Sequence, residues 1–148
     1  MKQIMAGTVM ATLIAVLVAQ VADTVNMRSI ASALATNHAQ QGLGDGVQFF
    51  FGDQPTPPVV SHLGTGSASE KMNSMGKSVE TSCNLTFLSD MLALQKRAQA
   101  LGADAVIHIV SNYKNVERSS ATQFECHDGA IMTDVALKGD FVKLKGSK

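Results

Sequence analysis

The sequence is short of aromatic and charged residues, and these shortages exclude several functions. Its 148 residues include no tryptophan and one tyrosine, which leaves little material for an aromatic ligand cage. Charged residues make up 16%, and twelve Lys and Arg balance twelve Asp and Glu. Such a chain has no net positive field to hold a phosphate backbone and no paired aromatic residues on which bases stack. We therefore expect no nucleic-acid partner.

The N-terminal segment indicates export. Residues 4–22 contain no charged residue or histidine, follow a start with Lys2, and end in small residues. This pattern predicts a secretory signal peptide over residues 1–22. The alternative is an uncleaved anchor, because the run approaches the ~20 residues that span a bilayer and Gln20 disturbs the cleavage signal. Both predict one exported domain over residues 23–148, periplasmic or secreted, with membrane contact only through residues 4–22 if they are retained.

Two cysteines lie in the exported part of the chain. Cys83 and Cys126 form an even count, which in an oxidising compartment predicts one disulfide bond. The alternative is a metal site that combines both thiolates with His127. No Cys-x-x-Cys spacing supports that alternative.

Hydrophobic periodicity predicts an α+β fold, with a small, mainly antiparallel sheet packed on one long helix and closed by a β-hairpin. The strands are expected at residues 47–51, 59–67, 105–110, 122–126, 130–137 and 141–144, with a short helix around residues 27–34 and an exposed loop over residues 69–78. Asp128-Gly129 predicts a two-residue hairpin turn, and Gly139 a bulge or bend.

The long helix is expected between Glu80 and Leu101, and Gly102 occupies a typical position after a helix end. Its apolar residues recur at helical spacing and should face the sheet, whereas its charged residues should face solvent. The apolar stripe comprises Phe87, Met91, Leu94, Ala98 and Leu101, and the charged residues outside it are Glu80, Asp90, Lys96 and Arg97.

The sequence contains no complete catalytic motif. Gly76-Lys77-Ser78 resembles the end of a phosphate-binding loop, but Lys71 stands where the first glycine is required, so no nucleotide is expected. His108 lies within a predicted strand and is expected to be half-buried, with a backbone partner. Glu125, His127 and Asp134 could converge across the hairpin, either as a solvated sheet face or as the ligand face of a metal-binding protein or hydrolase. No catalytic residue, cofactor or metal ligand is assigned.

Three stretches resemble a family of small exported bacterial proteins that often carry the name excinuclease ATPase subunit. They are Val47–Asp53, Leu92–Val110 and Glu125–Leu137. The helix and hairpin also resemble the wider superfamily of YbjQ-like domains, which includes the signalling domain of the Rcs envelope-stress lipoprotein. The resemblance implies an α+β sheet with one long helix, sometimes a ring-forming oligomer, in which Cys83 and Cys126 can meet. It brings no catalytic residues, and this chain differs from the lipoprotein in lacking a lipidation cysteine.

From these observations we expect a non-enzymatic exported module for binding or assembly, without ATPase or DNA-repair activity. Its expected partner is an envelope protein or a second copy of the chain.

Overall fold

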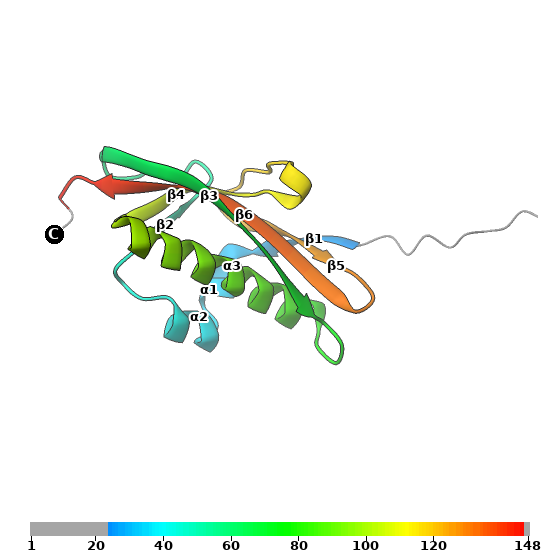
Figure 1. The fold of residues 1–148 in the computed structure, drawn as a ribbon. Coiled ribbons are helices and arrows are strands. Elements are labelled where there is room, and N and C mark those ends of the chain that lie inside the picture. Colours follow the sequence, from blue (N-terminus) through cyan, green and yellow to red (C-terminus); the bar gives the residue numbers. More distant parts are fainter. Residues whose placement is uncertain (1–23, 147–148) are drawn as a thin grey trace, which may run out of the picture.

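One long helix packs across a curled six-stranded sheet (Figure 1). The computed structural model describes residues 24–146, and the predicted signal segment lies outside these residues. Within the described part, no helix is long and apolar enough to cross a membrane. The predicted α+β class, with one long helix on a mostly antiparallel sheet, is confirmed.

The sheet has the order β1-β5-β6-β4-β2, and β3 pairs with the other side of β6. Among the described strands, β2 and β4 form the one parallel pair. In chain order the elements are β1 (Thr24–Ser29), α1 (Ile30–Leu34), α2 (Asn37–Gly42), β2 (Gln48–Phe51), β3 (Val59–Asn73), α3 (Val79–Leu101), β4 (Ala105–Ser111), the 3-10 turn η1 (Tyr113–Asn115), β5 (Gln123–Asp128) and β6 (Met132–Leu144).

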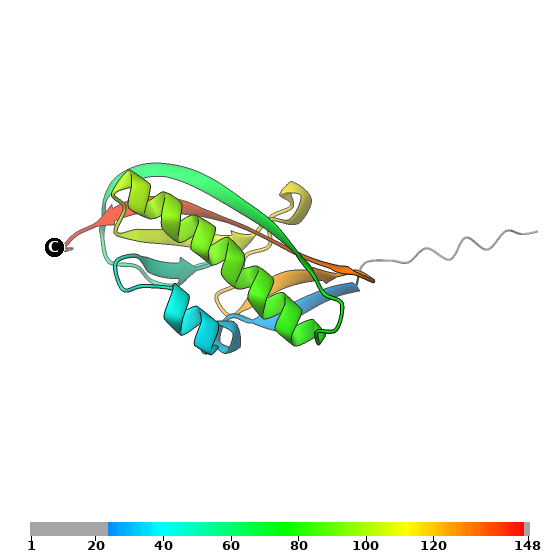
Figure 2. The ribbon, with the colours of Figure 1, turned by 60° about the horizontal axis from the view of Figure 1, so that its bottom comes forward.

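Helix α3 is bounded by clear local signals. The Ser78 hydroxyl accepts a hydrogen bond from the Thr81 amide at its start, and Gly102 adopts a left-handed φ of 70° after its end. Its apolar residues Phe87, Met91, Leu94 and Ala98 are buried against the sheet, as predicted. Figure 2 shows α3 lying across the sheet, beside the short helices α1 and α2.

The buried face of α3 differs from the predicted stripe at two residues. Leu101 is exposed because it lies in the last turn, whereas Asp90 is fully buried. Asp90 follows Ser82 and Thr86 at four-residue intervals, and all three are buried. The helix therefore buries a polar strip beside its apolar stripe, which charge patterning does not reveal.

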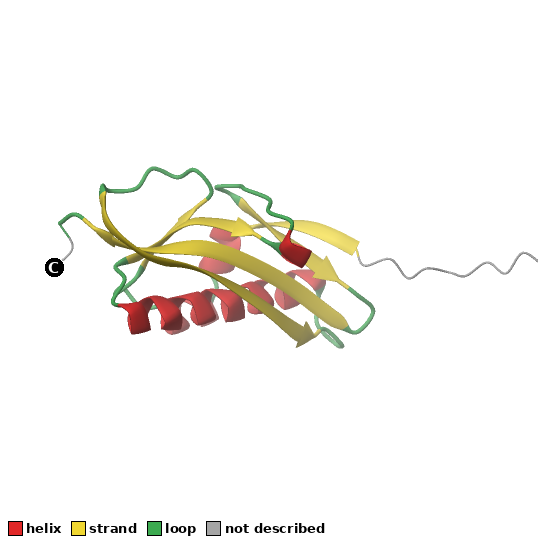
Figure 3. Cartoon of the chain, turned by 45° about the horizontal axis from the view of Figure 1, so that its top comes forward, coloured by secondary structure: helices red, strands yellow, loops and turns green. Residues whose placement is uncertain are grey.

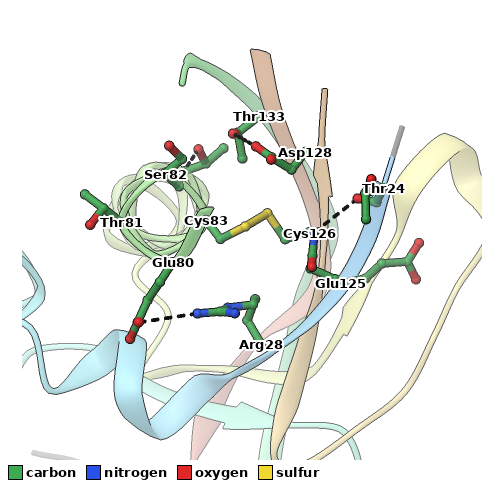
Figure 4. Close-up of a disulfide and its surroundings, with 12 residues drawn as sticks. Thr24, Arg28, Glu80, Thr81, Ser82, Cys83, Glu125, Cys126, Asp128 and Thr133 are labelled. Atoms are coloured by element: carbon green, nitrogen blue, oxygen red, sulfur yellow. Dashed lines mark hydrogen bonds and ion pairs between the residues drawn. A yellow bond between two sulfur atoms is a disulfide. The ribbon is translucent and has the colours of Figure 1, made fainter. Parts of the chain in front are cut away.

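A disulfide bond joins Cys83 near the start of α3 to Cys126 in β5, with the Cα atoms 5.9 Å apart (Figure 4). Both residues are fully buried, and the Phe87 and Phe124 rings stack in the same core with their centroids 4.3 Å apart. The predicted disulfide is present. The thiolate metal site is wrong, because the disulfide consumes both thiolates.

Two segments form strands where the sequence predicts other structure. Residues 24–29 pair antiparallel with β5, so Met27 lies in a strand and the first helix begins only at Ile30, capped by Ser29. Residues 69–73, predicted as loop, extend β3 along β6. Both segments lie in edge strands and contain no apolar run. Their pairing partners are distant in sequence, so no local pattern marks them as strands.

The closing hairpin turns two residues later than Asp128-Gly129 predicts. Asp128 pairs with Thr133, and the Gly129 amide donates to the Met132 carbonyl over 2.8 Å, so residues 129–132 form the turn. Strand β6 then runs without interruption through Gly139. The irregular register lies instead on its neighbour β4, between Ile107 and Val110.

We expect Gly139→Ala to destabilise the protein by about 1–3 kcal/mol, the usual cost of overpacking a core. A Cβ atom at this position would lie 2.6 Å from the Val106 side chain and 3.4 Å from the Ile107 carbonyl oxygen. Urea unfolding measures the change. Gly46→Ala is the matched control, because a Cβ there meets nothing within 4 Å. Equal stabilities of the two variants would contradict the close approach.

Candidate functional site

The sheet has an inner face that packs against α3 and an outer face that α3 does not cover. Phe124, Cys126 and Val135 belong to the core that α3 covers, whereas Glu125, His127 and Asp134 alternate with them and share the opposite, outer face. Figure 4 shows Cys126 directed toward α3 and Glu125 directed away from it. In Figure 3 the sheet lies in front of α3, and the segment that carries η1 crosses this outer face.

Glu125 holds His127 in a fixed orientation. Glu125 Oε1 lies 2.6 Å from His127 Nε2, and its Oε2 lies 3.1 Å from Arg118 Nε. The Tyr113 ring stacks on the His127 ring with the centroids 3.4 Å apart and the planes 15° from parallel. Since Glu125 and His127 are both buried, these contacts replace the hydration that the two polar side chains lose.

Asp134 is the cross-strand partner of His127, but its carboxylate turns to another residue. Its Oδ2 lies 3.7 Å from Lys71 Nζ, and its Oδ1 is buried without a hydrogen-bond partner among the described residues. A hollow of about 230 Å³ opens here. Its lining comprises Lys71, Tyr113, His127, Asp134 and the hairpin turn, residues 129–132.

Two further hollows continue along β3 on the same face. The middle one, of about 260 Å³, is lined by Ser67, Ser69 and polar residues of the 112–115 segment. The far one, of about 270 Å³, contains Thr65 and His108. Alternate residues 65–71 of β3 thus line all three hollows, over roughly 20 Å of strand. We call these three hollows together the outer groove.

His108 belongs to the far hollow and is not the half-buried, backbone-bonded residue that the sequence predicts. Its side chain is 59% exposed, and its Nδ1 lies 3.2 Å from Asp140 Oδ2. Thr65 donates to the other oxygen of Asp140 over 2.7 Å. The irregular register of β4 gives His108 a positive φ of 49°, which turns its side chain out of the core.

A second ion pair completes this end of the groove. Lys138 Nζ lies 2.6 Å from Glu117 Oε1. The hydrogen bond from Lys138 to Glu117, and then the charge of Glu117, raise the pKa of Lys138 above its ordinary value. The groove therefore presents fixed charges of both signs together with hydroxyl and amide groups, which suits a polar partner of mixed charge better than a polyanion.

The structure adds three residues to the predicted face, namely Tyr113, Arg118 and Lys71. Tyr113 and Arg118 come from the segment that leaves β4 and folds back through a bridge between Ser111 and Arg118. The sequence predicts neither a helix nor a strand for this segment. Lys71 lies in the part of β3 that was predicted as loop. No local spacing connects any of the three with His127.

The described residues do not favour a metal centre or a phosphate loop. Within residues 24–146, no three His, Cys, Asp or Glu side chains are grouped so that they could hold a metal ion. A strand does precede Gly76-Lys77-Ser78, contrary to expectation. However, Lys77 Nζ donates to the Asn73 carbonyl and the Ser78 hydroxyl caps α3, so local backbone groups occupy both side chains.

No family model, no curated protein and no solved structure matches the chain.

Proposed function

We propose that the chain is a non-enzymatic binding or assembly module of the bacterial envelope, whose partner docks in the outer groove. The observation that carries this proposal is the groove itself. Helix α3 covers one face of the sheet and leaves on the other a row of three polar hollows. The partner is a polar polypeptide segment, from an envelope protein or from a second copy of the chain.

The chemistry of the hollow at His127 supports binding rather than catalysis. A carboxylate that fixes a histidine is one part of a Ser-His-Asp type site, but such a site also needs a serine, threonine or cysteine within reach of the histidine. The lining of this hollow includes no serine, threonine or cysteine among the described residues. The alternative, a metal-binding protein or hydrolase that uses Glu125, His127 and Asp134, therefore has less support.

Two observations support an extracytoplasmic location. The uncharged run over residues 4–22 predicts export, and disulfide bonds such as Cys83–Cys126 persist mainly in oxidising compartments. The resemblance to exported bacterial proteins and to YbjQ-like domains agrees with this location. Alkylation of freshly isolated protein, followed by intact mass measurement, tests it, since two free thiols in the native compartment would contradict export.

Photocrosslinking in intact cells tests the docking site. We expect a photoreactive amino acid at Ser69, in the middle of the groove, to yield one discrete covalent product. The same amino acid at Gln99, on the exposed face of α3, should yield none. The mass of the product distinguishes a second copy from another protein. Equal yields at both positions, or no product at Ser69, would contradict the proposal.

Lys71→Ala provides a second measurement in the same assay. This substitution removes the ammonium group that faces Asp134. Because the Lys71 side chain is mostly exposed, the free energy of unfolding should change by less than about 1 kcal/mol. We expect it to reduce the yield of the Ser69 crosslink severalfold, because a charged group at one end of the groove is lost. An unchanged yield would exclude the His127 end from the docking surface.

A further inference from the structure

Exposed apolar side chains gather at one end of the molecule. Eight large apolar residues are exposed within residues 24–146. Five of them lie at the start of β1, in or beside the loop between β3 and α3, and in the turn between β5 and β6. These five, which we call the apolar tip, are Val25, Met75, Val79, Ile131 and Met132; the other three are Val60, Leu101 and Val116.

The apolar tip is held together by the backbone. The Ser74 amide donates to the Ile131 carbonyl over 2.9 Å, which ties the loop before α3 to the β5–β6 turn. Met75 and Ile131 therefore project from neighbouring turns, with 66% and 56% of their surfaces exposed. Turn residues are usually polar, so large apolar side chains at two joined turns indicate a surface that meets an apolar medium.

The described part of the chain begins at this same end, with Thr24. The first described residue of β1, Thr24, pairs with Asp128 at the edge of the hairpin turn. Figures 1 and 2 show the start of β1, the hairpin and the loop before α3 at one end, and the end of β6 at the other. A bilayer that holds residues 4–22 would thus lie within a few residues of the apolar tip.

We propose that residues 4–22 are retained as an anchor and that the apolar tip rests in the interface of the same lipid bilayer. Separate apolar side chains on two turns suit a lipid surface, which accepts them without complementary shape. The imperfect cleavage signal, with Gln20 before Ala22, agrees with retention. The apolar tip shares Ile131 and Met132 with the hollow at His127, whereas Ser67 and Thr65, which line the other two hollows, lie farther from the tip along β3.

Single tryptophan reporters test this contact, because the chain has no tryptophan of its own. The full-length chain is reconstituted into phosphatidylethanolamine and phosphatidylglycerol vesicles, with or without brominated acyl chains that quench indole fluorescence. We expect strong quenching for Ile131→Trp and Met75→Trp. Val60→Trp is the matched control, because Val60 is 67% exposed but roughly 40 Å along β3 from the tip.

Each outcome decides the proposal. Quenching at both tip positions, severalfold above that at Val60→Trp, supports it. Equal quenching at tip and control overturns it, and so does a blue-shifted but unquenched tip tryptophan, which would show that protein covers the tip. Intact mass of the chain isolated from its native envelope decides the retention of residues 4–22, and a mass that lacks them also overturns it. Circular dichroism of each variant establishes that the fold is kept.

Discussion

Replacing both Cys83 and Cys126 by alanine is expected to lower the free energy of unfolding by about 4 kcal/mol. The bond closes a loop across 43 residues, and the chain-entropy model assigns a loop of this size roughly that stabilisation. The loop contains most of α3 and all of β4, so its closure restricts a large part of the unfolded chain. Chemical unfolding of the variant and of the unsubstituted protein measures the difference.

Reduction of the unsubstituted protein is the matched control for the alanine variant. Both cysteines are fully buried, so alanine removes sulfur from the core and adds a packing loss to the loss of the cross-link. Dithiothreitol breaks the bond but keeps the sulfur atoms. We expect reduction to produce most of the destabilisation. Unchanged unfolding in dithiothreitol would show that the disulfide contributes little.

The parts of the fold that the sequence reveals are those whose signals are local. The spacing of Phe87, Met91 and Leu94 predicts α3 and its buried face, because a helix brings residues three and four apart together. The two cysteines predict the disulfide by their even number in a chain that is expected to be exported. Strand β1 and the second half of β3 escape prediction because their backbone partners, not their side chains, make them strands.

The candidate site was predictable only where neighbours in one strand share a face. Glu125 and His127 are two residues apart, so their common face follows from the strand period. Tyr113 and Arg118 reach them through a loop whose path depends on the bridge between Ser111 and Arg118. No sequence period encodes that path. The sequence predicts that Asp90 faces solvent, because an acidic residue in a helix is seldom buried without a partner.

Asp90→Asn is expected to stabilise the protein at neutral pH, by roughly 4 kcal/mol at pH 7. Asp90 is fully buried, and neither carboxyl oxygen has a hydrogen-bond partner among the described residues. Burial, followed by the charge of Glu70 and to a smaller extent that of Asp134, raises the pKa of Asp90 from 3.8 to about 9. The nearby backbone amide of Glu70 offsets part of this rise in the pKa, although it does not meet the geometry of a hydrogen bond to Asp90.

The sign of the pH dependence follows from the direction of this shift. Below pH 3.8 the carboxyl is protonated in the folded and the unfolded chain, so its burial carries no ionisation penalty. Above that pH the unfolded chain releases the proton while the folded chain keeps it until about pH 9, and stability falls by about 1.4 kcal/mol per pH unit. Asp90→Asn should remove this slope, whereas Asp45→Asn, at an exposed loop position, should retain it.

A variant that combines the two cysteine-to-alanine substitutions with Asp90→Asn tests whether their effects on stability add. Cys83 and Asp90 are seven residues apart on α3, about 10 Å along its axis, so their contributions should be nearly additive. At pH 7 the variant that combines both alanines with Asp90→Asn should regain most of the stability that the alanines remove. At about pH 3, where the Asp90 carboxyl is largely protonated in both states, it should regain little. The disulfide and the buried acid therefore contribute to stability independently and with opposite sign at pH 7, and equal recovery at both pH values would contradict this.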